Sequence, residues 1–154
     1  MKRRTFLKGS MASATLAVAV GAGLLSPSRV LAAEWPEAAL SSNSLDEAIQ
    51  AAFGSSDVTD SNEVQLKAPL QAENGAVVPI QVSTTAKPEK IAIISEKNPI
   101  PMVTVLNCGE GAGSMYSTRI KMGETSPVHC IVSSGGKLLR ASQEVKVTVG
   151  GCGG

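Results

Sequence analysis

Cysteine is the residue type in this chain with the most chemistry to offer, because its thiolate is a nucleophile that can hold another sulfur atom covalently. The 154-residue sequence contains three: Cys108, Cys130 and Cys152. Four glycines flank the last of them: Gly150, Gly151, Gly153 and Gly154. Glycine has no side chain to pack, and five extended residues span roughly 17 Å. Residues 150–154 therefore predict a slim, flexible arm with a thiol near its tip.

The sequence around Cys152 offers nothing that would activate this thiol. Its neighbours include no Lys, Arg or His, and no second cysteine stands at the spacing of a CxxC motif. Such a thiol is mostly protonated at neutral pH, so it is a poor catalyst and a suitable attachment point for a group that other proteins process. Two alternatives stay open: a terminal cysteine without a role, or one that links two chains.

The other two cysteines fall in the body of the chain. Cys108 ends one expected strand and Cys130 lies inside another. A disulfide between them is one alternative, and a buried, inert thiol at Cys130 is the other. Because the count is odd, at least one thiol is free or bonded between chains.

No recognisable catalytic or metal-binding motif appears among the other residues. His129 is the only histidine, and neighbouring residues of a strand point to opposite faces, so His129 and Cys130 cannot readily bind one metal ion. The methionines lack histidine partners for copper. The glycine-containing segment 109–113 is not followed by an expected helix, as a dinucleotide site requires. We expect no catalytic residue, no metal and no resident cofactor.

The first residues resemble a twin-arginine export signal. Arg3 and Arg4 are followed by Phe-Leu-Lys, and then by a mildly apolar stretch over residues 9–25. Small residues allow cleavage after Ala32, with Ala33 as the alternative. We therefore predict a signal peptide over residues 1–32 and a mature protein in the bacterial periplasm. An uncleaved membrane anchor is the less favoured alternative, because the apolar stretch is short.

Without residues 1–32 the charge balance changes sign. The whole chain has 14 basic and 13 acidic residues, and the leader contains five of the basic ones and no acid. Nine basic and 13 acidic residues remain, a net charge of −4. This balance leaves no basic patch for nucleic acid and no polybasic segment for a membrane surface. The rest of the chain, residues 33–149, has the length of one small domain.

One helix and about seven strands are predicted in this domain. Ser44 is a good N-cap, Glu47 stands three residues later, and the apolar residues of 45–53 share one helical face before Gly54. That face must cover either its own domain or a neighbour.

The strands expected are 64–70, 77–84, 90–96, 102–107, 115–121, 128–133 and 138–149, the last being one long strand or two. Asn74-Gly75 and Ser134 to Lys137 have the composition of hairpin turns. This pattern predicts an all-β fold, an immunoglobulin-like antiparallel β-sandwich with a short N-terminal helix and a flexible C-terminal arm; a partly open barrel is the alternative.

Several segments, together with the leader, resemble the SoxY family, the substrate-carrier subunits of the bacterial sulfur-oxidising (Sox) system. These segments are Ala68-Pro69, Ala72-Glu73-Asn74-Gly75-Ala76-Val77-Val78-Pro79, Glu96-Lys97-Asn98-Pro99-Ile100-Pro101, Thr118-Arg119-Ile120-Lys121-Met122 and Val145 to Gly154. The resemblance covers essentially the whole chain after the leader. Cys108 and Cys130 have no counterpart in the family pattern.

The resemblance implies a covalent carrier with an immunoglobulin-like sandwich that pairs with SoxZ in a heterodimer. Cys152 would bind thiosulfate through its sulfane sulfur, and no cofactor is implied other than this bound sulfur. SoxAX would load the thiol oxidatively, SoxB would release sulfate, and SoxCD, where present, would oxidise the remaining sulfur. The alternative function is a periplasmic thiol redox protein that uses Cys152 with Cys108 or Cys130. A tail activated by adenylation is disfavoured, because the periplasm lacks ATP.

Overall fold

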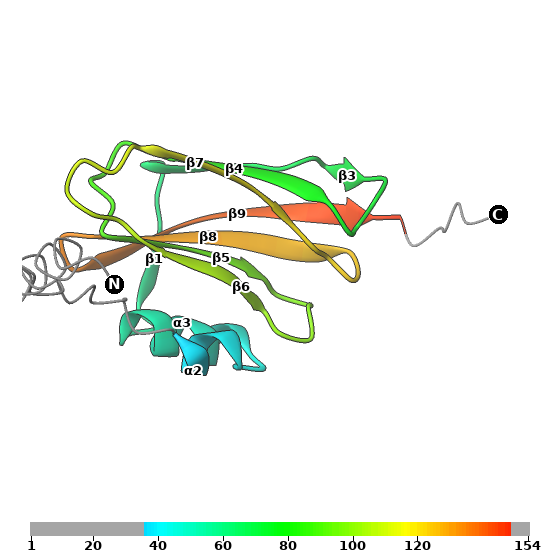
Figure 1. Cartoon of the computed structure of the whole chain (residues 1–154), viewed down its shortest axis with the longest axis horizontal. Coiled ribbons are helices and arrows are strands. Elements are labelled where there is room, and N and C mark those ends of the chain that lie inside the picture. The colour runs from blue at the N-terminus through cyan, green and yellow to red at the C-terminus, as the bar shows by residue number, and fades with distance from the viewer. Residues whose placement is uncertain (1–35, 149–154) are drawn as a thin grey trace, which may run out of the picture. The chain divides into compact units, whose positions relative to one another are not determined.

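The computed structural model describes residues 36–148 of the protein, so the predicted export signal and carrier arm lie outside the described residues. Two β-sheets stack face to face, and two helices cover the outer face of the larger one (Figure 1). The larger sheet has the strand order β1-β9-β8-β5-β6, with β3 also paired to β9. Its strands are β1 (Val58–Asp60), β3 (Gln71–Ala72), β5 (Lys90–Ser95), β6 (Met102–Asn107), β8 (Ser126–Ser134) and β9 (Lys137–Val147). The smaller sheet contains β2 (Val64–Lys67), β4 (Val78–Thr84) and β7 (Met115–Ile120) in the order β2-β4-β7.

The predicted β-sandwich is confirmed, and the last apolar run is one long strand, β9. β8 and β9 form a hairpin through Gly135 and Gly136, both of which have positive φ angles, as the turn composition predicts. The turn at Asn74-Gly75 is different. It connects β3 in the larger sheet to β4 in the smaller sheet, so the expectation of a hairpin there is wrong.

Two short strands that the sequence did not indicate pair with β9 in parallel. β1 pairs with the beginning of β9, from Val58 opposite Leu138 to Asp60 opposite Arg140. β3 pairs with its end, where Ala72 lies opposite Val147. Between them the chain leaves the larger sheet to form β2 in the smaller one. The edge of β9 is therefore covered at both ends by the same stretch of chain.

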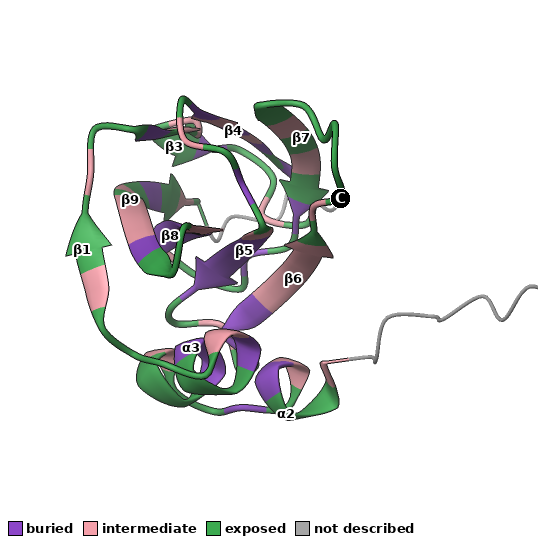
Figure 2. Cartoon of the chain, turned by 90° about the vertical axis from the view of Figure 1, so that its left-hand side faces the viewer, coloured by how far each residue is buried: buried purple, intermediate pink, exposed green. Residues whose placement is uncertain are grey.

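The helices are α2 (Glu37–Leu40) and α3 (Leu45–Phe53), of which α3 was predicted. The side-chain oxygen of Ser44 accepts a hydrogen bond from the backbone N–H of Glu47 at 3.3 Å, and Gly54 ends the helix at φ 77°. The helices lie on the side of β5 and β6 that faces away from β4 and β7 (Figure 2). Their apolar face therefore covers their own domain, which decides between the two expected alternatives.

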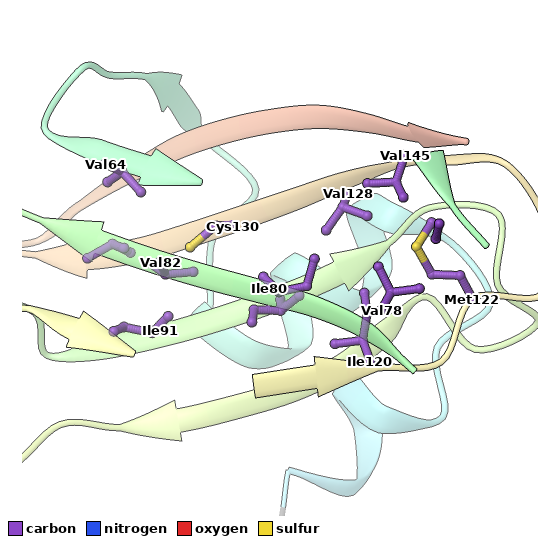
Figure 3. Close-up of a cluster of buried hydrophobic side chains, with 13 residues drawn as sticks. Val64, Val78, Ile80, Val82, Ile91, Ile120, Met122, Val128, Cys130 and Val145 are labelled. Carbon is purple, nitrogen blue, oxygen red and sulfur yellow. The ribbon is translucent and has the colours of Figure 1, made fainter. Parts of the chain in front are cut away.

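Burial divides the interior into two clusters, one on each face of the larger sheet. The cluster between the sheets is built mainly from valine and isoleucine and includes Cys130 and Met122 (Figure 3). The cluster beneath the helices is lined by alanines and larger aliphatic residues: Ala39, Ala48, Ile49, Ala52, Ala92, Ile94, Met102, Ile131 and Leu138. Small alanines let α2 and α3 approach the sheet closely. No helix within residues 36–148 is long and apolar enough to cross a bilayer.

Candidate functional site

The predicted attachment residue, Cys152, and the glycines around it lie outside the described residues. The structure does describe the strand that leads to them. β9 ends at Val147 and Thr148 is the last described residue, so Cys152 follows four residues later. Four residues span at most about 14 Å. The position of Thr148 therefore sets the region that the Cys152 thiol can reach.

Backbone hydrogen bonds hold the end of β9 in place. The N–H of Lys146 donates to the carbonyl of Leu70 at 3.0 Å, and the N–H of Thr148 donates to the carbonyl of Ala72 at 3.3 Å. The Thr148 hydroxyl also donates to the Ala72 carbonyl, at 3.2 Å. The short strand β3 thus fixes the chain up to its last described residue.

A close approach between three segments supports the same strand from inside. The N–H of Met122 donates to the carbonyl of Gly75 at 2.7 Å. A Cβ atom at Gly75 would lie 2.5 Å from the carbonyl oxygen of Met122 and 2.8 Å from Cγ1 of Val147, so only glycine fits without a shift. Three residues after Met122 in the sequence, the Thr125 hydroxyl accepts a hydrogen bond from the N–H of Val147 at 3.0 Å.

Asn98 joins two further loops at this end. Its Nδ2 donates to the carbonyl of Lys121 at 2.8 Å, and its Oδ1 accepts from the N–H of Gly123 at 3.1 Å. The Ser126 hydroxyl accepts from the N–H of Lys97 at 3.0 Å. We call this end of the sandwich the exit end; it comprises residues 69–77, 96–101, 121–126 and 146–148. Most of the segments that carried the family resemblance meet here, although they are far apart in sequence.

Cys108 lies at the opposite end of the sandwich, which we call the far end; it comprises residues 85–89, 108–114 and 134–137. β6 runs antiparallel to β5, and the N–H of Cys108 donates to the carbonyl of Glu89 just before β5. Cys130 lies on the other side of β5, opposite Ile93. Four residues along a strand and two strand spacings place the two cysteines roughly 16 Å apart.

Of the two alternatives for these cysteines, the disulfide between Cys108 and Cys130 is therefore wrong, because a disulfide requires Cα atoms within about 7 Å. Both thiols are free. Cys130 is 0% exposed, and burial raises its pKa to about 12, so it is the inert, buried thiol of the other alternative. Burial also raises the pKa of the half-buried Cys108. Neither environment favours a reactive thiolate.

Neither cysteine is within reach of Cys152 in the same folded chain. Cys108 lies level with the first residues of β9, so about ten residues of strand, roughly 30 Å, separate it from Thr148. Cys130 pairs with Ala141, roughly 23 Å from Thr148. Both distances exceed the reach of about 14 Å available to Cys152.

His129 takes part in a row of polar side chains that the sequence did not reveal. Its Nδ1 lies 2.7 Å from the Ser142 hydroxyl and its Nε2 lies 3.1 Å from Oε2 of Glu96. The row crosses β9, β8 and the end of β5 on the outer face of the larger sheet. Cys130 points to the inner face, so His129 and Cys130 lie on opposite faces of the sheet, as predicted. Only the strand register brings these residues together, so spacing alone could not have found them. Within residues 36–148, no three His, Cys, Asp or Glu side chains are grouped as metal ligands require.

Comparison with known protein families gives a match to the model described as "Sulfur oxidation protein SoxY", over residues 49–152. The match covers two thirds of the chain and includes Cys152. The chain belongs to the SoxY family. A solved SoxY structure, the sulfur carrier protein from Chlorobium limicola f thiosulfatophilum, is 42% identical with a TM-score of 0.62; the alignment covers 68% of this chain and 96% of that one. The predicted family and the predicted fold class are thereby confirmed.

Other comparisons add nothing to the SoxY assignment. An engineered protein is 10% identical with a TM-score of 0.39, covering 56% of this chain and 20% of its own. An endo-β-1,4-mannanase from Thermotoga petrophila is 14% identical with a TM-score of 0.40, covering 66% and 22%. Both similarities are too low to define a fold or a function. No curated protein matches the sequence.

Proposed function

We propose that this SoxY-family protein is a covalent carrier of thiosulfate-derived sulfur and that Cys152 is its attachment point. The observation that carries the proposal is the family match, which continues through residue 152. The firmly held end of β9 supports it, because a carrier needs a fixed origin for a short, narrow segment. We assign Gly150, Gly151, Gly153 and Gly154 the role of keeping that segment slim and free to turn.

The chemistry we propose begins with oxidative loading. The Cys152 thiol loses its proton and its sulfur bonds to the sulfane sulfur of thiosulfate. The two electrons released pass one at a time through the haem-containing loading enzyme to a one-electron acceptor, which is reduced twice. The product is a cysteine S-thiosulfonate. Hydrolysis then breaks the bond between the sulfane sulfur and the sulfonate group, releases sulfate and leaves a persulfide on Cys152. An ordinary thiol suits this role, because the partner enzymes supply the activation.

The partners in this proposal are those of the Sox system. SoxZ forms the heterodimer, SoxAX loads Cys152, SoxB hydrolyses the adduct, and SoxCD, where the host has it, oxidises the persulfide sulfur. We place these reactions in the periplasm, because residues 1–32 resemble a twin-arginine signal with Arg3 and Arg4. The carrier itself catalyses none of the steps.

The alternative, a thiol redox protein, has less support. It needs an intramolecular disulfide between Cys152 and a second cysteine. Cys130 is buried. Cys108 lies roughly 30 Å from Thr148, which is more than twice the span of about 14 Å that the four residues from Thr148 to Cys152 allow.

Cargo analysis of single-cysteine variants tests the proposal. We expect Cys152→Ser to abolish thiosulfate-dependent respiration and to remove every sulfur adduct from the protein, whereas Cys108→Ser retains both. Intact mass spectrometry with peptide mapping, on protein from thiosulfate-grown cells, measures the adducts. Adducts that persist in Cys152→Ser, or their loss in Cys108→Ser, would refute the carrier role of Cys152.

A further inference from the structure

Large apolar side chains that are exposed gather at the exit end. Four such residues occur within residues 36–148: Leu70, Val77, Ile100 and Met115. Leu70 is 77% exposed, Val77 50% and Ile100 50%, and all three belong to the exit end. Met115, 64% exposed at the start of β7, borders the far end. Exposed apolar surface of this kind is typical of the centre of a protein interface.

The reach of Cys152 requires contact at the same place. Its thiol follows Thr148 by four residues and moves at most about 14 Å from it. An enzyme that receives this thiol in an active site must therefore bring its own surface to the exit end. The deeper that active site lies, the closer the two surfaces must come.

Charge does not distinguish this surface. The exit end contains three exposed acidic residues and three exposed basic ones: Glu73, Glu96, Glu124, Lys97, Lys121 and Lys146. Their charges cancel, so electrostatic attraction has no net direction here. The apolar residues are then the distinguishing feature that a partner can recognise.

We propose that Leu70, Val77 and Ile100 form the docking surface for the enzyme that loads Cys152. This inference rests on the proposed carrier function. The enzyme presents an apolar rim around a channel no deeper than about 14 Å, and the rim covers the three side chains when the thiol enters. The hydrogen bonds of Asn98 and Thr125 keep the loops around this surface and the end of β9 in one arrangement.

The test compares substitutions at the two ends of the molecule. Leu70→Asp and Ile100→Asp alter the exit end, and Met115→Asp makes the same kind of change to an exposed apolar residue near the far end. Each variant is purified with its partner subunit and mixed with thiosulfate, the purified haem-containing loading enzyme and an excess of a one-electron acceptor such as oxidised cytochrome c. Intact mass spectrometry then gives the initial rate of adduct formation on Cys152 at several carrier concentrations.

We expect the KM for the carrier to rise about tenfold in Leu70→Asp and Ile100→Asp and to change less than about twofold in Met115→Asp. All variants should react with the small disulfide reagent DTNB at the wild-type rate, because the thiol itself is untouched. Raising the salt concentration should change the wild-type KM by less than about twofold, since the contact is apolar.

Three results would overturn the docking surface: an unchanged KM at the exit end, an equal effect in Met115→Asp, or a strongly salt-dependent KM. Loss of the partner subunit during purification of the exit-end variants would also overturn it, because the surface would then be the subunit interface. If the wild-type carrier forms no adduct on Cys152, the proposed function itself fails. If all variants load equally, only the docking surface fails.

Discussion

The exit end of the sandwich and one loop of the far end, residues 108–114, differ in how firmly they are held. Elsewhere at the far end the loops are joined, because the Glu89 carboxylate accepts hydrogen bonds from the N–H of Gly135 at 3.3 Å and from the Ser133 hydroxyl at 3.1 Å. At the exit end Asn98 connects two loops, and Thr125 and β3 hold the last residues of β9. At the far end, the loop from residue 108 to 114 has three glycines at which an added Cβ would meet no atom within 4 Å. One end is braced across its loops, whereas this far-end loop has open space around it.

The difference shows where the fold needs accuracy. In the proposed function, a segment only a few residues long must enter a partner enzyme, and this requires a well-defined starting point. The hydrogen bonds of Asn98, Thr125 and β3 lie at the same end of the sandwich as that starting point, and so do the exposed Leu70, Val77 and Ile100. In the far-end loop, hydrogen bonds to other segments are made by Cys108 and Ser114, whereas residues 109–113 between them make none.

The largest effect is expected when a new thiol is introduced at the exit end and compared with the native thiol at the far end. Glu124 is exposed at the exit end, next to Thr125, whose hydroxyl contacts β9. With mild oxidation, we expect Glu124→Cys to form an intramolecular disulfide with Cys152. Position 124 is next to Thr125, whose hydroxyl contacts Val147, so it is within the roughly 14 Å that Cys152 can reach from Thr148. Peptide mapping of the monomeric fraction under non-reducing conditions identifies the linked pair.

The native thiol at the far end is the control for this cross-link. Cys108 should form no intramolecular bond to Cys152 under the same conditions, since roughly 30 Å of strand separates its level from Thr148. A Cys108–Cys152 bond within one monomer would mean that the end of β9 detaches from the sheet. It would then support the alternative function, a thiol redox protein that uses Cys152 with Cys108.

A glycine at each end provides the next comparison. In Gly75→Ala the new Cβ collides with the carbonyl oxygen of Met122, a backbone atom that cannot move alone. We expect the free energy of unfolding to fall by about 1–3 kcal/mol. Gly109→Ala, where the space is open, should be neutral or slightly stabilising. Urea denaturation measures both, and equal midpoints would contradict the difference between the ends.

Removal of the Asn98 side chain should have a smaller effect. Asn98→Ala removes two hydrogen bonds between loops, and for partly exposed groups we expect a loss of about 1 kcal/mol. The matched variant at the far end is Asn107→Ala, at an exposed position that ends β6. Hydrogen exchange of the Gly123 amide should accelerate in Asn98→Ala alone. Unchanged exchange would show that the Asn98 side chain does not hold the loop of Gly123 in place.

Sequence reasoning succeeded where local chemistry decides structure. The N-cap at Ser44 and the stop at Gly54 defined α3, and the bounds of β6 agree with its apolar run. The glycine pair between β8 and β9 gave the hairpin. In each case the determining residues lie within a few positions of the element itself.

Features set by pairing between distant segments could not be predicted. β1 and β3 have three and two residues, too few for a pattern, and exist because β9 offers an edge at both ends. The separation of Cys108 from Cys130 depends on the register of both partners of β5. The need for glycine at position 75 arises from Val147 and Met122, which are far away in sequence.

The smallest effect is expected at an ion pair that joins β1 to the first half of β9. Arg140 donates from Nε and Nη2 to the two carboxylate oxygens of Asp60, at 2.7 and 3.2 Å, and these hydrogen bonds lower the pKa of Asp60. A carboxyl whose pKa is lower in the folded state stabilises the fold above its unfolded pKa and loses that contribution as the pH falls through the folded value. Arg140→Gln should therefore be slightly less stable than wild type near neutral pH, and the difference should vanish in acid. Because Asp60 is exposed, solvent screens the pair and the difference in stability stays small.

Denaturation midpoints from about pH 7 to pH 2 measure this difference, with Lys137→Gln as the control that removes an exposed cation of β9. If the stability difference between Arg140→Gln and wild type persists in acid, Arg140 stabilises the fold through packing of its side chain on β9, and the charge of the pair with Asp60 contributes nothing.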